Sequence, residues 1–348
     1  MKILSLNQVI DFYKDNISAT QINELKNVDK VYPVKISDYY AKLSLKNKAA
    51  FMQAFPSKEE LIINPYSEID PLCENSHEVI PGFIHKYKNK AIILTTNQCF
   101  MNCRHCTRKR LMREKNHLRS PDYSAIIKYL KNHPEINDIL LTGGDVLTLE
   151  DDFIISLLEK IENVGSINSI RIGTRAPVTY PERITDYLFQ KIGNFKNVWI
   201  NTQFNHPCEL TLESINACLL IQKHGIPICN QTVILKGIND NYEILHNLFL
   251  GLVHNRIIPY YLYQCDNVIG VSHFITSPEF GAETIRKLRL ELPGMAVPRY
   301  IIDTQNNNGK IIAEYGNVIS LSEKHVELIN NEGQKFMMRY SINSPKIE

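Results

Sequence analysis

Short apolar runs alternate with longer helical segments between residues 90 and 262, and this alternation constrains the fold more than any other feature. The apolar runs have the length of strands: Ala91–Thr95, Asp138–Thr142, Ser169–Gly173, Val198–Gln203, Ile228–Leu235 and Ile257–Leu262. The segments between them read as helices: Tyr123–Asn132, Asp151–Glu162, Pro181–Lys191, Thr211–His224 and Tyr242–Asn255. Strands and helices in this order predict a parallel α/β sheet built from six strand–helix units.

Six units are two fewer than a complete TIM barrel contains, so we expect an incomplete, open (β/α)6 barrel. We divide the chain into an N-terminal helical and irregular arm (1–85), the partial barrel (86–280) and a C-terminal segment (281–348). Polar motifs follow most of the predicted strands. Ligand sites of parallel barrels lie at the carboxyl ends of the strands, which places the expected site at that end of the barrel.

The regions on either side of the barrel follow other patterns. We expect one arm helix over Val9–Tyr13 and a second beginning at Ser18 or Thr20, followed by a turn-rich stretch from Pro56 to Pro81. After Phe280 we expect a helix over about 282–292 and a strand over 299–302. Short apolar runs up to residue 340 then predict a small β-rich cap.

Three cysteines, Cys99, Cys103 and Cys106, lie within eight residues directly after the first predicted barrel strand. A tetrahedral zinc site would need a fourth ligand, and the nearby His105 lies inside the loop itself. Ordinary buried thiols are the alternative, although they rarely gather so densely in a basic loop. Three thiolates on a [4Fe–4S] cluster leave one iron open, and such an iron can chelate S-adenosylmethionine (SAM). The spacing resembles that of the radical SAM superfamily.

A longer series of motifs narrows this resemblance. In order along the chain they are CRHCTR (103–108), LTGGD (141–145), RIGTR (171–175), NTQFNHP (201–207), NQTVILKGIND (230–240), PYYLYQCD (259–266) and the loop from Asp303 to Lys310. The series resembles the lysine 2,3-aminomutase family of radical SAM enzymes and runs from about residue 36 to 340. The resemblance implies a radical SAM barrel and three cofactors: a [4Fe–4S] cluster, SAM and pyridoxal phosphate (PLP).

The resemblance also assigns roles to residues of this chain. It implies that Cys99, Cys103 and Cys106 bind the cluster. It also implies that Lys310 holds PLP as a Schiff base. Without the resemblance, a lysine after 306-NNNG-309 would be interpreted as a solvent-exposed turn residue. The remaining cofactor contacts that it implies are Gly143, Gly144 and Asp145 at the methionyl amine of SAM, and Lys86, Lys90 and Gln231 at the PLP phosphate. Tyr263 is a candidate to pack near the cofactor, or else a buried strand tyrosine.

Three charged residues bear on the substrate. In lysine-specific relatives, aspartates at the positions of Asp266 and Asp303 bind the distal ammonium, and Arg108 would hold the substrate carboxylate. We therefore expect an isomerase that converts L-lysine to β-lysine. Arginine is an alternative substrate, because a guanidinium also suits an acidic pair, and a non-catalytic iron–sulfur or PLP-binding protein is an alternative of another class.

Composition bears on partners and surroundings. A formal net charge of +2 over 348 residues gives no reason to expect nucleic acid as a partner. No apolar run is long enough for a membrane span, no signal peptide is recognisable, and the eight cysteines do not form a disulfide framework, so we expect a cytoplasmic protein. Asn241 stands where zinc-binding relatives carry a cysteine, so we expect no zinc. An electron donor such as flavodoxin or ferredoxin and a homo-oligomer complete the expected partners.

Overall fold

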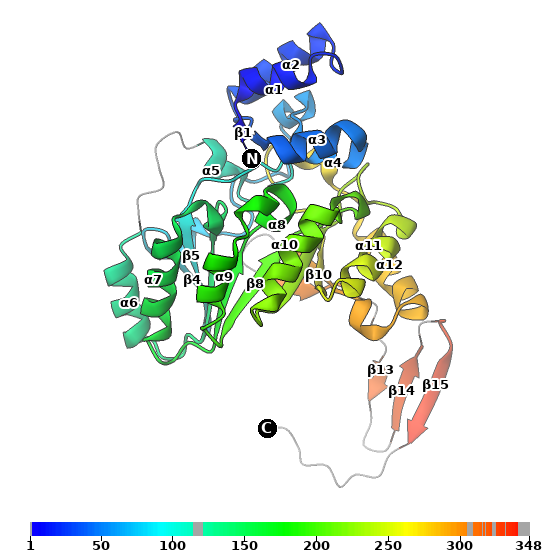
Figure 1. Ribbon diagram of the computed structural model, residues 1–348. Coiled ribbons are helices and arrows are strands. Elements are labelled where there is room, and N and C mark those ends of the chain that lie inside the picture. The colour runs from blue at the N-terminus through cyan, green and yellow to red at the C-terminus, as the bar shows by residue number, and fades with distance from the viewer. Residues whose placement is uncertain are drawn as a thin grey trace.

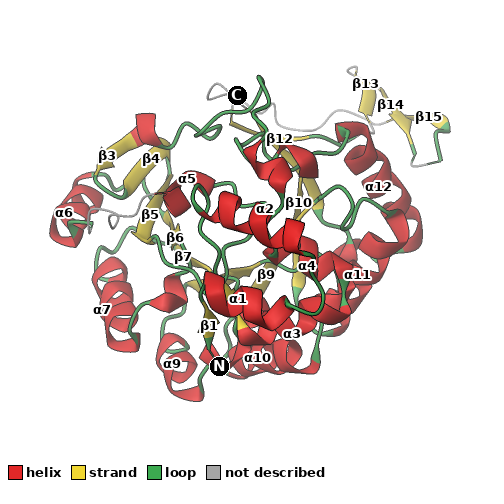
Figure 2. Cartoon of the chain, turned by 90° about the horizontal axis from the view of Figure 1, so that it is seen from above, coloured by secondary structure: helices red, strands yellow, loops and turns green. Residues whose placement is uncertain are grey.

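A computed structural model describes residues 2–113, 121–304, 309–314, 316, 318–321, 325–330 and 332–339. In this part of the chain, one ten-stranded sheet has the order β12-β11-β10-β9-β8-β7-β6-β5-β4-β3. Its central strands are parallel and curve into an open barrel (Figures 1 and 2). The α/β class and the incomplete barrel that the sequence predicts are confirmed.

All six predicted barrel strands are present, and in the described chain a seventh parallel strand extends the sheet. They are β5 (Lys90–Thr96), β6 (Asp138–Gly143), β7 (Ser169–Gly173), β8 (Val198–Thr202), β9 (Ile228–Val233), β10 (Ile258–Tyr263) and β11 (Arg299–Thr304). The strand expected over 299–302 thus pairs in parallel with β10. Helix α12 (Pro278–Glu291) precedes β11, and Tyr300 and Ile301 of β11 are buried. One more strand–helix crossover therefore continues the barrel.

Helices cover the outer face of the sheet (Figure 2). They are α6 (Tyr123–Asn132), α7 (Asp151–Glu162), α9 (Asp186–Ile192), α10 (Leu212–Lys223), α11 (Tyr242–His254) and α12 (Pro278–Glu291). The continuous helix expected over 181–191 is wrong: a short 3-10 turn, Pro181–Arg183, precedes α9. The break arises because the Thr185 side chain accepts a hydrogen bond from the Leu188 backbone N–H and so caps a new helix.

The two edges of the open sheet lie close together. One edge consists of the antiparallel strands β3 (Glu78–Ile80) and β4 (Phe83–Tyr87), and the other of β12 (Gly309–Ile312), which is antiparallel to β11. A Cβ atom placed on Gly309 would lie 3.7 Å from the ring of Tyr87. The ends of β4 and β12 are therefore neighbours, although they are opposite ends of the sheet order.

The N-terminal arm covers the end of the barrel that carries the cysteines (Figures 1 and 2). Its elements are β1 (Ile3–Leu4), α1 (Leu6–Tyr13), α2 (Ala19–Asp29), β2 (Ile36–Ser37), α3 (Asp38–Lys46) and α4 (Lys48–Ala54). Two backbone hydrogen bonds join the arm to the cysteine loop, from Asn102 N to Lys35 O at 2.8 Å and from Arg104 N to Gln53 O at 2.9 Å. Tyr13 of the arm is fully buried in the same apolar core as the barrel strands.

The expected β-rich C-terminal segment is also present. Beyond β12, a small antiparallel sheet contains β13 (Val318–Leu321), β14 (His325–Ile329) and β15 (Lys335–Arg339), and Figure 1 shows it set apart from the barrel. The asparagine-rich stretch of the loop before Lys310 lies outside the described residues. Within the described chain, no helix combines the length and the apolar character needed to cross a membrane.

A buried ion cluster ties the arm to the cysteine loop. Glu60, which is 1% exposed, accepts hydrogen bonds from Arg104 Nη2 at 2.6 Å and from Lys109 Nζ at 2.7 Å. The ammonium of Lys109 also donates to the carbonyl oxygen of Gly270, on the far side of the barrel mouth, at 2.9 Å. Burial alone would raise the pKa of Glu60, but the two cations outweigh it and the pKa is lowered.

We expect Glu60→Gln to destabilise the protein by about 3–5 kcal/mol, because it leaves two buried cations without their shared carboxylate. Thermal unfolding followed by circular dichroism measures the effect, with Glu59→Gln at the neighbouring position as the matched control. Equal melting temperatures for the two variants would contradict this role of Glu60.

Candidate functional site

The cysteine loop follows β5 at the carboxyl end of the barrel and leads into α5 (Lys109–Arg113). All eight cysteines of the chain are free thiols. Burial, together with the charge of Cys103, raises the pKa of Cys99 well above its usual value and that of Cys106 to about 11. Three thiolates in this position therefore require a positive partner to be stable.

Two observations test whether a cluster suits this loop. Within the described residues, no three His, Cys, Asp or Glu side chains surround one point closely enough to hold a single metal ion. A cubane cluster does not need such a point, because each thiolate ligates a different iron. Inside the loop, His105 Nε2 lies 3.2 Å from the side-chain amide nitrogens of Gln203 and Asn205, while its buried Nδ1 has no partner in the described chain.

The assignment of hydrogen bonds to His105 follows from its surroundings. The two amide nitrogens donate to Nε2, so Nδ1 carries the proton. Burial lowers the pKa of His105 well below its usual value, and the charges of Arg175 and Lys109 add to this effect, so the ring is neutral. A buried N–H donor without a protein partner in the described chain is able to donate to a bound group. The unpartnered donor is compatible with a bound cluster, and the absence of a single-ion site among the described residues does not count against one.

The glycines of the LTGGD motif allow the backbone at the end of β6 to lie against the cysteine loop. Gly143 has a φ of +118°, and a Cβ atom on it would lie 2.4 Å from the Thr96 carbonyl oxygen. A Cβ atom on Gly144 would lie 2.2 Å from the carbonyl oxygen of Gln98, directly before Cys99. Only glycine fits at either position. These residues shape the backbone that presents the thiols.

Asp145 of the same motif is already bound within the chain. Its Oδ1 accepts hydrogen bonds from Thr174 Oγ1 at 2.7 Å and from Leu147 N at 3.0 Å, and its Oδ2 accepts one from Arg175 N at 2.8 Å. Burial raises the pKa of Asp145, although these donors act against it. The carboxylate therefore joins the ends of β6 and β7, and both of its oxygens accept hydrogen bonds from the chain itself.

Lys310 stands at the carboxyl ends of β10 and β11, where its Nζ pairs with Asp303 and donates to Tyr263 Oη at 3.3 Å. The ammonium also lies 4.7 Å from the centre of the Tyr263 ring. Its side chain is 39% exposed, whereas that of Asp303 is 8% exposed. Lys310 is thus held in place at the mouth of the barrel and remains accessible to a ligand.

The three residues expected at the PLP phosphate lie on β4, β5 and β9 of the sheet. Within the described chain, no hydrogen bond or ion pair joins Lys310 to Lys86, Lys90 or Gln231. Lys86 Nζ donates to the Leu72 carbonyl oxygen at 2.9 Å. Lys90 is exposed at the start of β5, and Gln231 lies within β9. Tyr87, which pairs with Lys90 across the β4–β5 hairpin, lies beside β12 and so beside Lys310.

The charged residues assigned to the substrate are brought together. Burial and the neighbouring charge of Asp303 raise the pKa of Asp266 to about 6, and the charges of Lys310 and Arg108 act against that shift. Arg108 in turn is close enough to Cys106 for the two charges to interact. The thiols, Arg108, the two aspartates and Lys310 therefore share one mouth of the barrel.

Sequence reasoning missed the partner of Arg108. Glu74, which is 2% exposed, lies 3.0 Å from Arg108 Nε and 2.7 Å from its Nη2, and it also accepts from Arg110 Nη2 at 2.6 Å. These cations outweigh the effect of burial and lower the pKa of Glu74 to about 2. The only signal for this pair in the sequence is the presence of acidic residues in the turn-rich stretch from Pro56 to Pro81. Their spacing does not indicate which of them pairs with Arg108.

Comparisons with known proteins match this chain to a family model and to several relatives. The model of the radical SAM superfamily matches residues 93–248. An L-lysine 2,3-aminomutase from Methanococcus maripaludis is 40% identical over 89% of this chain and 73% of its own length. One from Bacillus subtilis is 38% identical over 94% of this chain and 69% of its own. A glutamate 2,3-aminomutase from Clostridioides difficile is 36% identical over 78% of this chain and 64% of its own.

We expect Gly144→Ala to displace the backbone at Gln98 and to reduce the iron bound per chain after anaerobic reconstitution. The added methyl group would also destabilise the fold by about 1–3 kcal/mol. Gly294→Ala is the control, because a Cβ atom there meets nothing within 4 Å. Iron analysis and melting temperature measure the two effects, and normal iron content in Gly144→Ala would contradict the close packing described above.

Proposed function

The chain belongs to the L-lysine 2,3-aminomutase family of radical SAM enzymes, and from this premise we propose that it converts L-lysine to β-lysine by moving the amino group from the α to the β carbon. Enzymes of this family are isomerases that use a [4Fe–4S] cluster, SAM and PLP. The observation that carries the proposal is that Lys310, the acidic pair Asp266 and Asp303, and Arg108 share the barrel mouth into which the cysteine loop opens.

We assign the cofactors to residues that fit them. Cys99, Cys103 and Cys106 would hold the cluster, Lys310 would hold PLP, and the cations Lys86 and Lys90 with Gln231 would bind its phosphate. The glycines at 143 and 144 would keep SAM close to the cluster by holding the loop in place. When bound, these cofactors supply hydrogen abstraction and delocalisation of an unpaired electron.

The carboxylate of Asp303 could pair with Lys310 in the absence of substrate and with the substrate ammonium in its presence. In the structure its carboxylate pairs with the ammonium of Lys310. When Lys310 is engaged with PLP, the distal ammonium of a lysine substrate would bring an equivalent positive charge to the same place. Asp303 could then change partner without being left as a buried, unpaired carboxylate, a state that is costly. Asp266 completes an acidic pair that suits a cationic side chain.

Arg108 keeps one edge available for the substrate carboxylate. Glu74 occupies its Nε and Nη2, whereas its Nη1 has Thr142 Oγ1 as a neighbour at 3.4 Å, a long hydrogen bond. A planar guanidinium can bind carboxylates on two edges at once. Glu74 would therefore fix the plane of Arg108 while Nη1 receives the substrate.

Three further proposals concern the surroundings of the enzyme. Reduction of the cluster would depend on an external one-electron donor such as flavodoxin or ferredoxin. The protein would act in the cytoplasm as a homo-oligomer. The exposed side chains of Ile311 and Ile312 on the edge strand β12 support self-association, because exposed apolar edge strands favour pairing with another chain.

The proposal is tested by incubating anaerobically reconstituted protein with SAM, PLP and dithionite and with equal amounts of lysine, arginine and glutamate. We expect β-lysine as the product by mass spectrometry, and no product from Lys310→Ala with the cluster intact. β-Arginine or β-glutamate as the main product would overturn the substrate assignment. An absence of any β-amino acid from protein that cleaves SAM would overturn the reaction.

We expect kcat/KM for lysine to fall about tenfold per pH unit as the pH drops below about 6. The raised pKa of Asp266 means that its carboxyl group becomes protonated, and therefore neutral, in that range. A neutral carboxyl group no longer attracts the substrate ammonium. Asp266→Asn should weaken lysine binding at neutral pH and remove this part of the pH profile. Asp11→Asn, at an exposed position of α1, should leave the pH profile unchanged. An identical profile in Asp266→Asn would contradict the role of Asp266.

A further inference from the structure

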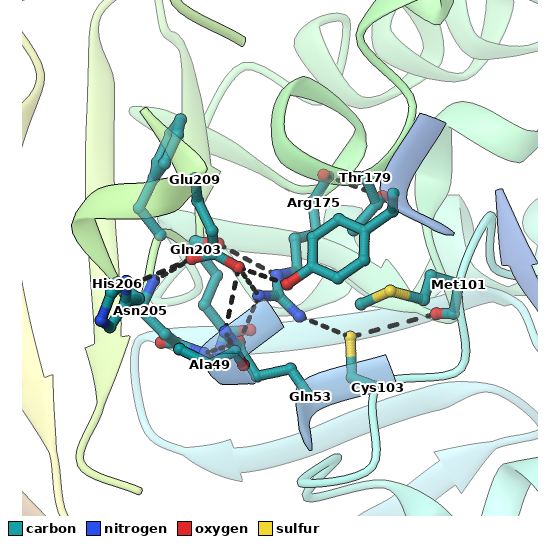
Figure 3. A network of polar contacts seen from close by, with 12 residues as sticks. Ala49, Gln53, Met101, Cys103, Arg175, Thr179, Gln203, Asn205, His206 and Glu209 are labelled. Atoms are coloured by element: carbon teal, nitrogen blue, oxygen red, sulfur yellow. Dashed lines mark hydrogen bonds and ion pairs between the residues drawn. The ribbon is translucent and has the colours of Figure 1, made fainter. Parts of the chain in front are cut away.

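A guanidinium group contacts one of the three cysteines directly. Arg175 Nη1 donates a hydrogen bond to Cys103 Sγ at 2.9 Å (Figure 3). Arg175 follows β7 and is 8% exposed, so water does not compete strongly for its charge. The residue lies in the RIGTR motif, to which the sequence assigns no role.

The other nitrogens of Arg175 fix the direction of this contact. Its Nε donates to the Gln203 carbonyl oxygen at 3.0 Å, and its Nη2 donates to Gln53 Oε1 at 2.6 Å and to Glu209 Oε1 at 2.7 Å. All three nitrogens are therefore bound, and the planar group cannot rotate without breaking several hydrogen bonds. Nη1 is left aimed at the sulfur.

Glu209 anchors the whole arrangement and is itself fully buried. It accepts hydrogen bonds from Tyr40 Oη at 2.6 Å and from Gln53 Nε2 at 3.1 Å, and both donors belong to the N-terminal arm. Its second oxygen accepts from Asn205 N at 2.6 Å. The arm and the loop after β8 thus hold Arg175 from two sides, as Figure 3 shows.

We propose that Arg175 is a positioning residue that raises the reduction potential of the iron–sulfur cluster by donating a charge-assisted hydrogen bond to the sulfur of Cys103. The inference rests on the proposed function, in which Cys103 is a cluster ligand. Reduction adds one electron and so one negative charge to the cluster. A cationic donor at a ligand sulfur stabilises the reduced form more than the oxidised form, and hydrogen bonds to the sulfurs are among the factors that set such potentials.

A purely structural role makes a different prediction. If Arg175 only neutralised Glu209, removal of both charges together would change stability and leave the potential of the cluster unchanged. The double variant Arg175→Met with Glu209→Gln removes the pair without changing the net charge, so long-range electrostatics contribute little to any shift. A lower potential in this variant reports the lost hydrogen bond.

The chain offers a control ion pair on β7, the strand that Arg175 follows. Arg171 lies in β7 and pairs with Asp138, with Arg171 Nε 2.9 Å from Oδ1 and Nη2 2.5 Å from Oδ2. Arg171→Met with Asp138→Asn therefore removes an ion pair of the same kind, with side chains 23% and 15% exposed, that has no hydrogen bond to Cys99, Cys103 or Cys106 in the described chain. Both double variants are reconstituted anaerobically, and the midpoint potential of the cluster is measured by redox titration followed by electron paramagnetic resonance.

We expect a more negative midpoint potential for the variant at 175 and 209 than for the parent, and an unchanged potential for the control. An unchanged potential in a fully loaded variant at 175 and 209 would overturn the proposal. If this variant does not fold, the potential of Arg175→Lys is measured instead. A lysine ammonium can pair with Glu209, but it lacks the planar guanidinium that binds the Glu209 carboxylate and Cys103 Sγ at the same time. A more negative potential supports the proposal, and an unchanged one overturns it.

The titration needs no amino-acid substrate, so its outcome is separate from the test of the proposed function. Parent protein that binds the cluster but forms no β-lysine would overturn the proposed reaction, while the potentials would still decide the role of Arg175. Parent protein that binds no cluster would overturn both.

Discussion

Buried carboxylates neutralise the basic region around the cysteines, and the arrangement of the site depends on them. Glu60 pairs with Arg104 and Lys109, Glu74 with Arg108 and Arg110, and Glu209 with Arg175. Each of these carboxylates is at most 2% exposed. Charges removed from water to this extent are tolerated only when they are paired and hydrogen-bonded. Arg104, Arg108, Lys109 and Arg110 of the basic cysteine loop thus find their counter-charges within the protein.

The source of these carboxylates explains why the N-terminal region belongs to the site. Glu60 and Glu74 come from the segment between α4 and β4, and Gln53 and Tyr40 of the arm hold Glu209 and, through it, Arg175. Removal of the arm would therefore leave cations beside the thiols without partners. The arm positions charged side chains at the cysteine loop as well as covering the end of the barrel.

An open sheet also determines where the proposed PLP lysine can stand. Lys310 belongs to the last strand of the sheet order, yet the approach of β12 to β4 places it beside Tyr87 from the other edge. A closed barrel has no edge strands, because its first and last strands pair with each other. The open barrel therefore allows Tyr87 of the β4–β5 hairpin to lie beside Lys310.

Hydrophobic periodicity and turn chemistry are local properties of a chain, so the parallel strand–helix order, the position of the three thiols after β5 and the polar residues at the strand ends could be predicted from the residues alone. That Asp266 and Lys310 lie close together could also be predicted, because the carboxyl ends of parallel strands meet at one end of the barrel. The tertiary structure alone decided that Glu74 holds Arg108 and that Asp145 is bound to the end of β7. It also decided that Arg175 reaches Cys103 while Glu209 holds it. Pairs of this kind join residues 30 to 72 positions apart, and which carboxylate meets which cation depends on packing and desolvation that no local pattern records.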